Sequence, residues 1–268
     1  MKVVRAVEEL RTTLAAARLR GDRVGLVPTM GALHDGHRAL LRAARAGSDV
    51  VVMSLFVNPA QFDDPGDLER YPRDEASDLA TADAEGADLV FGPSATALYP
   101  PGFDTWVDPG AIGEMLEGAA RPGHFRGVAT ICAKLFSIVQ PARAWFGQKD
   151  AQQVAVVRQV VRDLDLAVEI VAVPTVRAVD GLALSSRNAR LSPGQRAAGL
   201  ALPRALEVGL RAQQAGGDPV SAARTALESA ADVSIDYVDL ADFDGPTLVA
   251  AVRIGDIRLI DNVRLTEP

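Results

Sequence analysis

The chain has 268 residues, of which 48% are hydrophobic, and carries a formal net charge of −7 at pH 7. This length suffices for two domains or one large one, and the net negative charge argues against general nucleic-acid binding, which requires a basic face. The single cysteine, Cys132, excludes an intrachain disulfide framework and fits a reducing compartment.

The N-terminal residues include charged side chains and no apolar core of the signal-peptide type, so we expect a cytoplasmic protein. No apolar run is long enough to span a bilayer, so we expect no membrane partner. An amphipathic helix is predicted from about residue 6 to 20. A buried strand follows at residues 24–27, and a turn containing Pro28, Gly31 and Gly36 leads into a second helix.

Two histidines, His34 and His37, stand three residues apart at the predicted start of this second helix. The free N–H groups and the dipole of a helix N-terminus attract phosphate, and imidazole groups can donate hydrogen bonds to it. On spacing alone, two solvated loop histidines are an equally good interpretation. A zinc site is disfavoured because no cluster of cysteine, carboxylate and histidine accompanies the pair. NAD binding is disfavoured because the glycines do not follow the dinucleotide pattern.

Strands and helices alternate along the following residues. Strands are predicted at residues 49–56, 89–92, 143–146 and 168–173, and helices at residues 73–84, through residues 135–139, and up to about residue 164. Because Pro59 forces a turn after the second strand, Asn58 and Gln61 should lie at the carboxyl edge of the sheet, beside the histidines. Residues 117–128 are basic and rich in glycine, and they precede a predicted helix. They are either a functional segment or a plain solvent-exposed loop. This rhythm predicts an α/β fold with a doubly wound, Rossmann-like parallel sheet.

The pattern changes after Pro174. Asp180-Gly181 is a hairpin signal, and Ser192-Pro193-Gly194-Gln195 is a capping box with proline at the first helical position. Two helices are predicted at about residues 193–213 and 219–231, and short strands at residues 235–238, 249–254 and 257–260. We therefore expect two domains, residues 1–175 and a smaller α+β domain of residues 176–268.

The string from Pro28 to His37 contains histidine, any residue, glycine and histidine, and resembles the signature of class I aminoacyl-tRNA synthetases and related nucleotidyltransferases. It is closer still to the pantothenate synthetases (pantoate–β-alanine ligases), which the chain resembles in several further strings in the same order. The resemblance implies ATP-dependent condensation of pantoate with β-alanine through a pantoyl-adenylate, with release of pyrophosphate and AMP. It also implies Mg²⁺ bound with ATP, for which no protein ligand can be named, and a homodimer.

The same resemblance assigns residues to roles. Catalysis is assigned to His37, His34, Lys149 and Arg187. ATP binding is assigned to Met30, Gly31, His34, His37, Gly147, Gln148, Lys149, Asp150, Val176, Leu184, Ser185, Ser186 and Arg187, with Asp150 suited to the ribose and Val176 to the adenine. Pantoate binding is assigned to Gln61 and Gln153, and β-alanine binding to Gln61. Tyr71, Glu117 and Arg121 match family strings near the pocket, and Leu184 stands where many members carry methionine.

The residue types suit this chemistry independently of the resemblance. A carboxylate is already ionised at neutral pH, so its attack on phosphorus requires alignment and neutralisation of phosphate charge rather than a strong base. The C-terminal domain, through Ser185, Ser186 and Arg187, is expected to close over the ATP site.

One alternative function is that of an adenylyltransferase acting on a phosphorylated acceptor, which would need cationic side chains in place of Gln61 and Gln153. Another is a catalytically inactive module that binds nucleotides or another subunit. Such a module would be expected to have lost a histidine or Lys149, and all of these residues are present.

Overall fold

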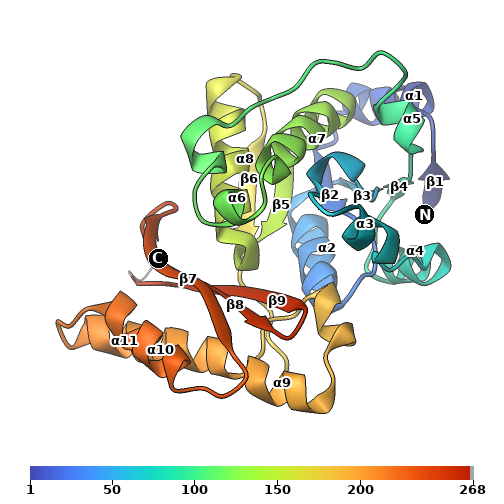
Figure 1. Cartoon of the computed structure of the whole chain (residues 1–268). Coiled ribbons are helices and arrows are strands. Elements are labelled where there is room, and N and C mark those ends of the chain that lie inside the picture. Colours follow the sequence, from blue (N-terminus) through green and yellow to red (C-terminus); the bar gives the residue numbers. More distant parts are fainter. Residues whose placement is uncertain (266–268) are drawn as a thin grey trace. The chain divides into compact units, whose positions relative to one another are not determined.

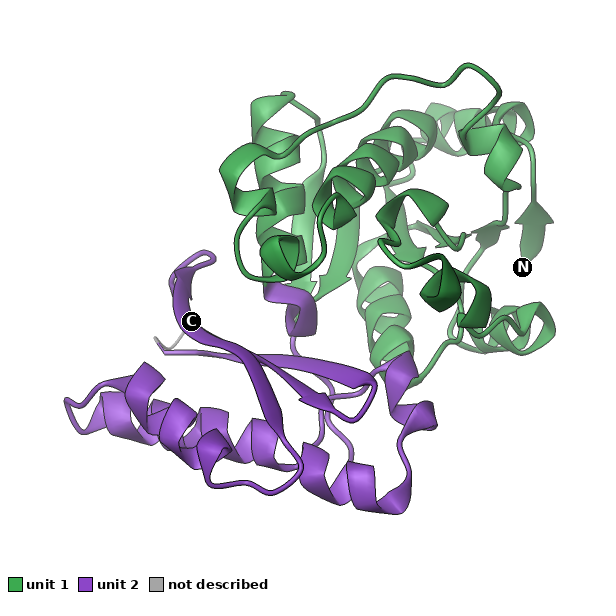
Figure 2. Cartoon of the chain, viewed as in Figure 1, with its two compact units in different colours: residues 1–147, 152–173 green, residues 148–151, 174–268 purple. Residues whose placement is uncertain are grey.

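A computed structural model describes residues 1–265, which form two compact units (Figure 2). The first, called here the sheet unit, comprises residues 1–147 and 152–173. The second, the C-terminal unit, comprises residues 148–151 and the chain from Pro174 onward. The division falls close to the expected boundary after residue 175, but it differs for residues 148–151, which group with the C-terminal unit.

The sheet unit is built on six parallel strands in the order β1-β4-β3-β2-β5-β6 (Figure 1). Their bounds are β1 Lys2–Val4, β2 Val24–Thr29, β3 Val50–Leu55, β4 Leu89–Phe91, β5 Arg143–Gly147 and β6 Glu169–Val173. The chain runs outward from β2 to β3 and β4, then crosses to β5 and β6 on the other side of β2. This confirms the doubly wound Rossmann-like fold, and the strand order reverses at β2 and β5, where such folds bind ligands. The short edge strand β1 was not predicted.

Helices connect these strands. Their bounds are α1 Val7–Leu19, α2 Asp35–Gly47, α3 Pro65–Arg70, α4 Glu75–Ala84, α5 Ala95–Leu98, α6 Glu117–Ala120, α7 His124–Val139 and α8 Ala151–Asp163, with short 3₁₀ turns η1 Pro59–Gln61 and η2 Gly110–Gly113. No helix within residues 1–265 combines the length and the apolarity needed to cross a membrane.

Successive residues of each central strand enter different hydrophobic cores. In β2, Leu26 packs in a cluster with Leu14 of α1 and Leu135 of α7, whereas Val27 packs with Leu41 of α2. Side chains of a strand alternate between the two faces of its sheet, so helices cover both faces. This double cover explains why the strand sequences read as continuous apolar runs.

The C-terminal unit is α+β, as expected. It contains the antiparallel strands β7 Ser234–Asp242, β8 Pro246–Ile254 and β9 Ile257–Arg264, the helices α9 Pro193–Gly199, α10 Ala201–Gln214 and α11 Pro219–Glu228, and the 3₁₀ turns η3 Gln148–Asp150 and η4 Ser186–Arg190. The strands are longer than predicted. The expected single helix over residues 193–213 is two helices that meet at Leu200. Pro203 accounts for the break, because it lacks the N–H that would bond to the carbonyl of Gly199.

Candidate active site

The turn after β2 is held by a carboxylate from another helix. Gly31 and Ala32 both adopt positive φ angles, +85° and +52°. The buried side chain of Asp78, in α4, accepts the backbone N–H of Ala32 at 3.0 Å and that of Leu33 at 2.8 Å. Two amide donors stabilise this buried charge and fix the main chain just before His34. Asp78 was not predicted as a site residue, because in the sequence it is one acidic residue among others in a polar helix.

His34 and His37 cap the N-terminus of α2 reciprocally. Nδ1 of His34 accepts the N–H of Gly36 at 3.1 Å, and Nδ1 of His37 accepts the N–H of His34 at 3.2 Å. The two rings lie 4.2 Å apart between centroids. Since Nδ1 is an acceptor in both rings, the hydrogen of each neutral imidazole lies on Nε2. Gly36 is required beside them, because a Cβ there would lie 2.8 Å from Cε1 of His34.

Gln61 is oriented by a buried asparagine. Asn58 donates from its side-chain nitrogen to Oε1 of Gln61 at 3.0 Å and to the carbonyl of Gly127 at 3.2 Å. Its oxygen accepts the hydroxyl of Tyr99 at 2.8 Å, and burial raises the pKa of Tyr99, which keeps that hydroxyl protonated. The Gln61 nitrogen therefore faces away from Asn58 and lies 3.2 Å from Sδ of Met30. Gln61 does lie at the edge beside the histidine turn, as predicted.

The main chain of Gln61 is held by residues of the basic, glycine-rich segment 117–128. Nδ1 of the buried His124 lies 2.8 Å from the Gln61 carbonyl, and Arg121 donates to the same oxygen at 3.3 Å. Arg121 also lies 3.3 Å from Nε2 of His124 and 3.2 Å from a carboxylate oxygen of Asp63. Because Arg121 only donates, His124 carries its hydrogen on Nδ1 and donates it to Gln61. These residues are thus structural supports of Gln61 and not a plain solvent loop.

Two adjacent glutamines at the start of α8 have different surroundings. Gln152 is buried; its oxygen accepts the N–H of Glu117 at 3.0 Å, and its nitrogen donates to the carbonyls of Ile112 and Met115, each at 2.8 Å. Gln153 is half-buried, and its side chain makes no hydrogen bond with any residue in the range 1–265. Gln152 is therefore structural, whereas the amide of Gln153 is available to a ligand.

Lys149 lies in the η3 turn, which belongs to the C-terminal unit. The side-chain nitrogen of Asn262, in β9, donates to the carbonyls of Gln148 at 2.9 Å and Lys149 at 2.8 Å. Nζ of Lys149 lies 3.3 Å from a carboxylate oxygen of Asp150. The η3 turn is thus supported by Asn262, which lies more than a hundred positions away in the sequence and was not predicted as a site residue.

The hairpin predicted around Asp180-Gly181 is present in the C-terminal unit. Arg177 and Ala183 form an isolated antiparallel bridge. The N–H of Leu184 donates to the carbonyl of Val176 at 3.0 Å, so these two predicted ATP residues are neighbours. The N–H of Leu184 is engaged within the hairpin, and leucine is close in volume to methionine.

The serines and the arginine of the predicted ATP segment follow this hairpin. Ser185 is the N-cap of η4, and its hydroxyl oxygen accepts the N–H of Arg187 at 3.3 Å. The side chain of Asn188 donates to the carbonyl of Ala183 at 2.9 Å, which ties η4 back to the hairpin. Ser186 and Arg187 are therefore the first residues of a short turn that is capped at its N-terminal end.

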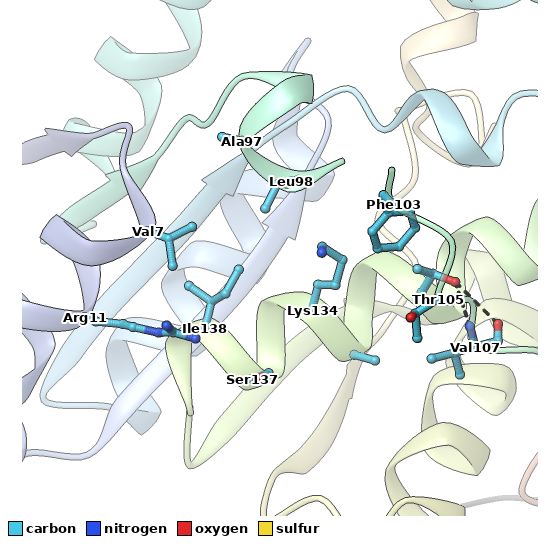
Figure 3. A pocket seen from close by; sticks show the side chains of 12 residues that line it. Val7, Arg11, Ala97, Leu98, Phe103, Thr105, Val107, Lys134, Ser137 and Ile138 are labelled. Atoms are coloured by element: carbon cyan, nitrogen blue, oxygen red, sulfur yellow. Dashed lines mark hydrogen bonds between the residues drawn. The ribbon is translucent and has the colours of Figure 1, made fainter. Parts of the chain in front are cut away.

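A cavity of about 440 Å³ lies elsewhere in the sheet unit, between α1, α5 and α7 (Figure 3). Its lining includes Val7, Arg11, Leu98, Phe103, Lys134 and Ile138. Nζ of Lys134 lies 4.6 Å from the centre of the Phe103 ring, a cation–π distance. None of the site residues predicted from the sequence lines this cavity, so it is separate from the turn that carries the histidines.

Known proteins resemble the chain over almost its whole length. A sequence model described as Pantoate-beta-alanine ligase matches residues 2–264. The chain belongs to the pantoate-β-alanine ligase family. Pantothenate synthetase of Rhizorhabdus wittichii is 50% identical in an alignment of 276 positions that covers 98% of each chain. That of Corynebacterium efficiens is 50% identical in an alignment of 286 positions that covers 99% of each chain.

Solved structures of the pantoate-β-alanine ligase family share the whole fold. The pantothenate synthetase of Thermus thermophilus has a TM-score of 0.93 at 44% identity and covers 100% of both chains. A ligase of this family from Francisella tularensis, described as complexed with beta-gamma ATP and β-alanine, has a TM-score of 0.85 at 31% identity and covers 99% of this chain and 98% of its own. Enzymes of the family join pantoate to β-alanine, and the chain is accordingly an amide-forming ligase.

No three histidine, cysteine, aspartate or glutamate side chains within residues 1–265 gather closely enough to hold a metal ion between them.

Proposed function

We propose that the chain activates pantoate with ATP, and that the residues described above bind the substrates. The reciprocal capping of His34 and His37 carries this proposal, because it directs the ring hydrogens to Nε2 at the N-terminus of α2. Such an end of a helix favours phosphate through its dipole, and the Nε2 hydrogens of the two rings can be donated to phosphate oxygens. The ATP and β-alanine described for the Francisella tularensis relative support the choice of substrates.

In the first step, an oxygen of the pantoate carboxylate attacks the α-phosphorus of ATP. The bond between the α-phosphorus and the oxygen that bridges it to the β-phosphorus breaks, and pyrophosphate leaves with the electron pair of that bond. His34, His37, Lys149 and Arg187 are proposed to neutralise the charge that accumulates on the phosphate oxygens, which is the main demand of this step. Mg²⁺ is proposed to enter with ATP on its phosphates, and no side chain is assigned to it.

In the second step, the uncharged amine of β-alanine attacks the acyl carbon of pantoyl-adenylate. The amide bond forms, AMP leaves with the electron pair of the acyl–oxygen bond, and the amine loses a proton. Water would compete with the amine at this carbon, so its exclusion is part of the mechanism. The C-terminal unit, with Ser185, Ser186 and Arg187, is proposed to close over bound ATP for this reason.

Gln61 and Gln153 are proposed to bind pantoate, with Gln61 also near β-alanine. Asn58 occupies the oxygen of Gln61, and one hydrogen of the Gln61 nitrogen is directed to Sδ of Met30, so the second hydrogen can be donated to a ligand oxygen. Pantoate offers hydroxyl and carboxylate oxygens that accept such a bond, whereas a phosphorylated acceptor would demand cations. The neutral amides favour the ligase over an adenylyltransferase.

The enzyme is further proposed to be a cytoplasmic homodimer.

The proposal is tested by mixing the protein with ATP and Mg²⁺, with or without pantoate and β-alanine, and measuring pyrophosphate, AMP and pantothenate. We expect pyrophosphate only when pantoate is present, and free AMP and repeated turnover only when β-alanine is added as well. Adenylation of a phosphorylated acceptor, without any response to pantoate, would refute the assignment.

A further inference from the structure

The η3 turn is fixed by both hydrogens of one buried amide. Asn262 is 6% exposed, and its side-chain nitrogen donates to two consecutive carbonyls, those of Gln148 and Lys149. An NH₂ group has two hydrogens, so these bonds at 2.9 and 2.8 Å saturate it. Since both acceptors are main-chain oxygens, Asn262 defines where the backbone of Lys149 lies.

Asn262 is itself rigidly held within the C-terminal unit. It lies in β9 opposite Val249 of β8. The preceding residue, Asp261, accepts the N–H of Asn262 at 2.8 Å and forms a two-pronged ion pair with Arg177, at 2.6 and 3.1 Å. The Asp261 side chain is 1% exposed, and Arg177 belongs to the hairpin that precedes Ser185. Two hydrogen bonds between planar groups give this support a defined geometry.

These contacts explain why residues 148–151 belong to the C-terminal unit, although the residues on both sides of them belong to the sheet unit (Figure 2). We infer that Asn262 is a positioning residue for Lys149, and that the C-terminal unit rather than the sheet holds this lysine. Lys149 and Arg187 are then carried by the same unit. This inference rests on the proposed role of Lys149 in binding ATP phosphates.

The test replaces the amide with a carboxylate of the same shape. Asn262→Asp removes both donors and places an acceptor against two carbonyls, whereas Asn262→Ser keeps one donor and introduces no charge. Gln195→Glu is the matched control, because Gln195 also donates to a carbonyl of this unit, that of Ile254 at 3.4 Å, but does not touch η3. Each variant is assayed for adenylation rate, for the KM values of ATP and pantoate, and for melting temperature.

We expect Asn262→Asp to slow pantoyl-adenylate formation by about 10–100-fold, the size of effect that a misplaced catalytic group produces. Asn262→Ser should lose less, Gln195→Glu should stay near the original rate, and the KM for pantoate should not change. Hydrogen exchange of the amides at residues 148–151 should accelerate in Asn262→Asp, while exchange at residues 34–37 stays the same.

A double-mutant cycle separates positioning from general support of the fold. In a Lys149→Ala background, Asn262→Asp should cause little further loss of rate, because the group it positions is absent. Additive losses, or an undiminished rate in Asn262→Asp while Lys149→Ala is impaired, would overturn the positioning role alone. An undiminished rate in Lys149→Ala itself would instead overturn the proposed role of the lysine.

Discussion

Asp78 accepts the backbone N–H of Leu33 at 2.8 Å, and this bond joins α4 to the residue that immediately precedes His34. A second bond, from the N–H of Ala32 at 3.0 Å, makes the contact two-pronged. The turn contains two residues with positive φ, one of which is alanine, and such a conformation persists only where its surroundings hold it. Asp78 supplies that restraint.

Asp78→Asn is therefore expected to disturb the histidines. The amide has one acceptor oxygen and places a donor against the other backbone N–H, which should destabilise the fold by about 1–3 kcal/mol. Turnover should fall by about 10-fold or more, because His34 moves with the turn. Asp74→Asn, which alters the N-cap of the same helix, is the control. Equal rates in the two variants would show that the turn keeps its shape without Asp78.

His37 has two functions that one pair of substitutions can separate. In His37→Asn, the side-chain oxygen can replace Nδ1 as acceptor of the His34 N–H, but nothing replaces the donor at Nε2. We expect turnover to fall by about 10²–10³-fold with little change in melting temperature. His37→Ala should lose the cap as well, at a cost of about 1 kcal/mol in stability. Near-normal turnover of His37→Asn would exclude a phosphate-binding role.

Gln153 and Gln152 provide a matched pair for pantoate recognition. Gln153→Leu keeps most of the volume but leaves polar groups of pantoate unpaired, so the KM for pantoate should rise far more than that for ATP. Gln152→Leu removes bonds to three main-chain groups and should instead lower the melting temperature. Parallel losses for ATP and pantoate in Gln153→Leu would identify Gln153 as structural too.

Arg187 should act after ATP binds. If the segment of residues 184–188 closes over ATP, Arg187→Ala will slow adenylation in a single turnover while changing ATP affinity only modestly. ATP should also slow hydrogen exchange across residues 184–188. A large loss of ATP affinity with normal adenylation at saturating ATP, and unchanged exchange, would indicate a fixed binding segment.

Cys132 should be unreactive in the folded protein. Burial raises its pKa to about 12, so the neutral thiol, which is a poor nucleophile, predominates at every pH below that value. Alkylation by iodoacetamide at pH 8 should be slow in the native protein and rapid in denaturant, as followed by mass spectrometry. Rapid labelling of the folded chain would mean that α7 opens readily.

The elements that sequence alone predicted are those whose causes are local. The apolar residues of β2 indicated a strand covered on both faces, and the Ser192–Gln195 capping box indicated the start of α9, as the structure confirms. The spacing of His34 and His37 likewise placed both rings on one helix start. Each of these signals depends on neighbours within a few positions, so it can be read along the chain.

The supports of the candidate site were decided only by the tertiary structure. Asp78 lies 45 positions from Leu33, His124 63 positions from Gln61, and Asn262 113 positions from Lys149. A polar side chain that satisfies a distant main-chain group has the same local sequence pattern as a solvated one, and Gln152 cannot be told from Gln153 in this way. Only the packing of the folded chain determines which polar groups lose water and must find a partner, and these partners hold the proposed substrate-binding residues in place.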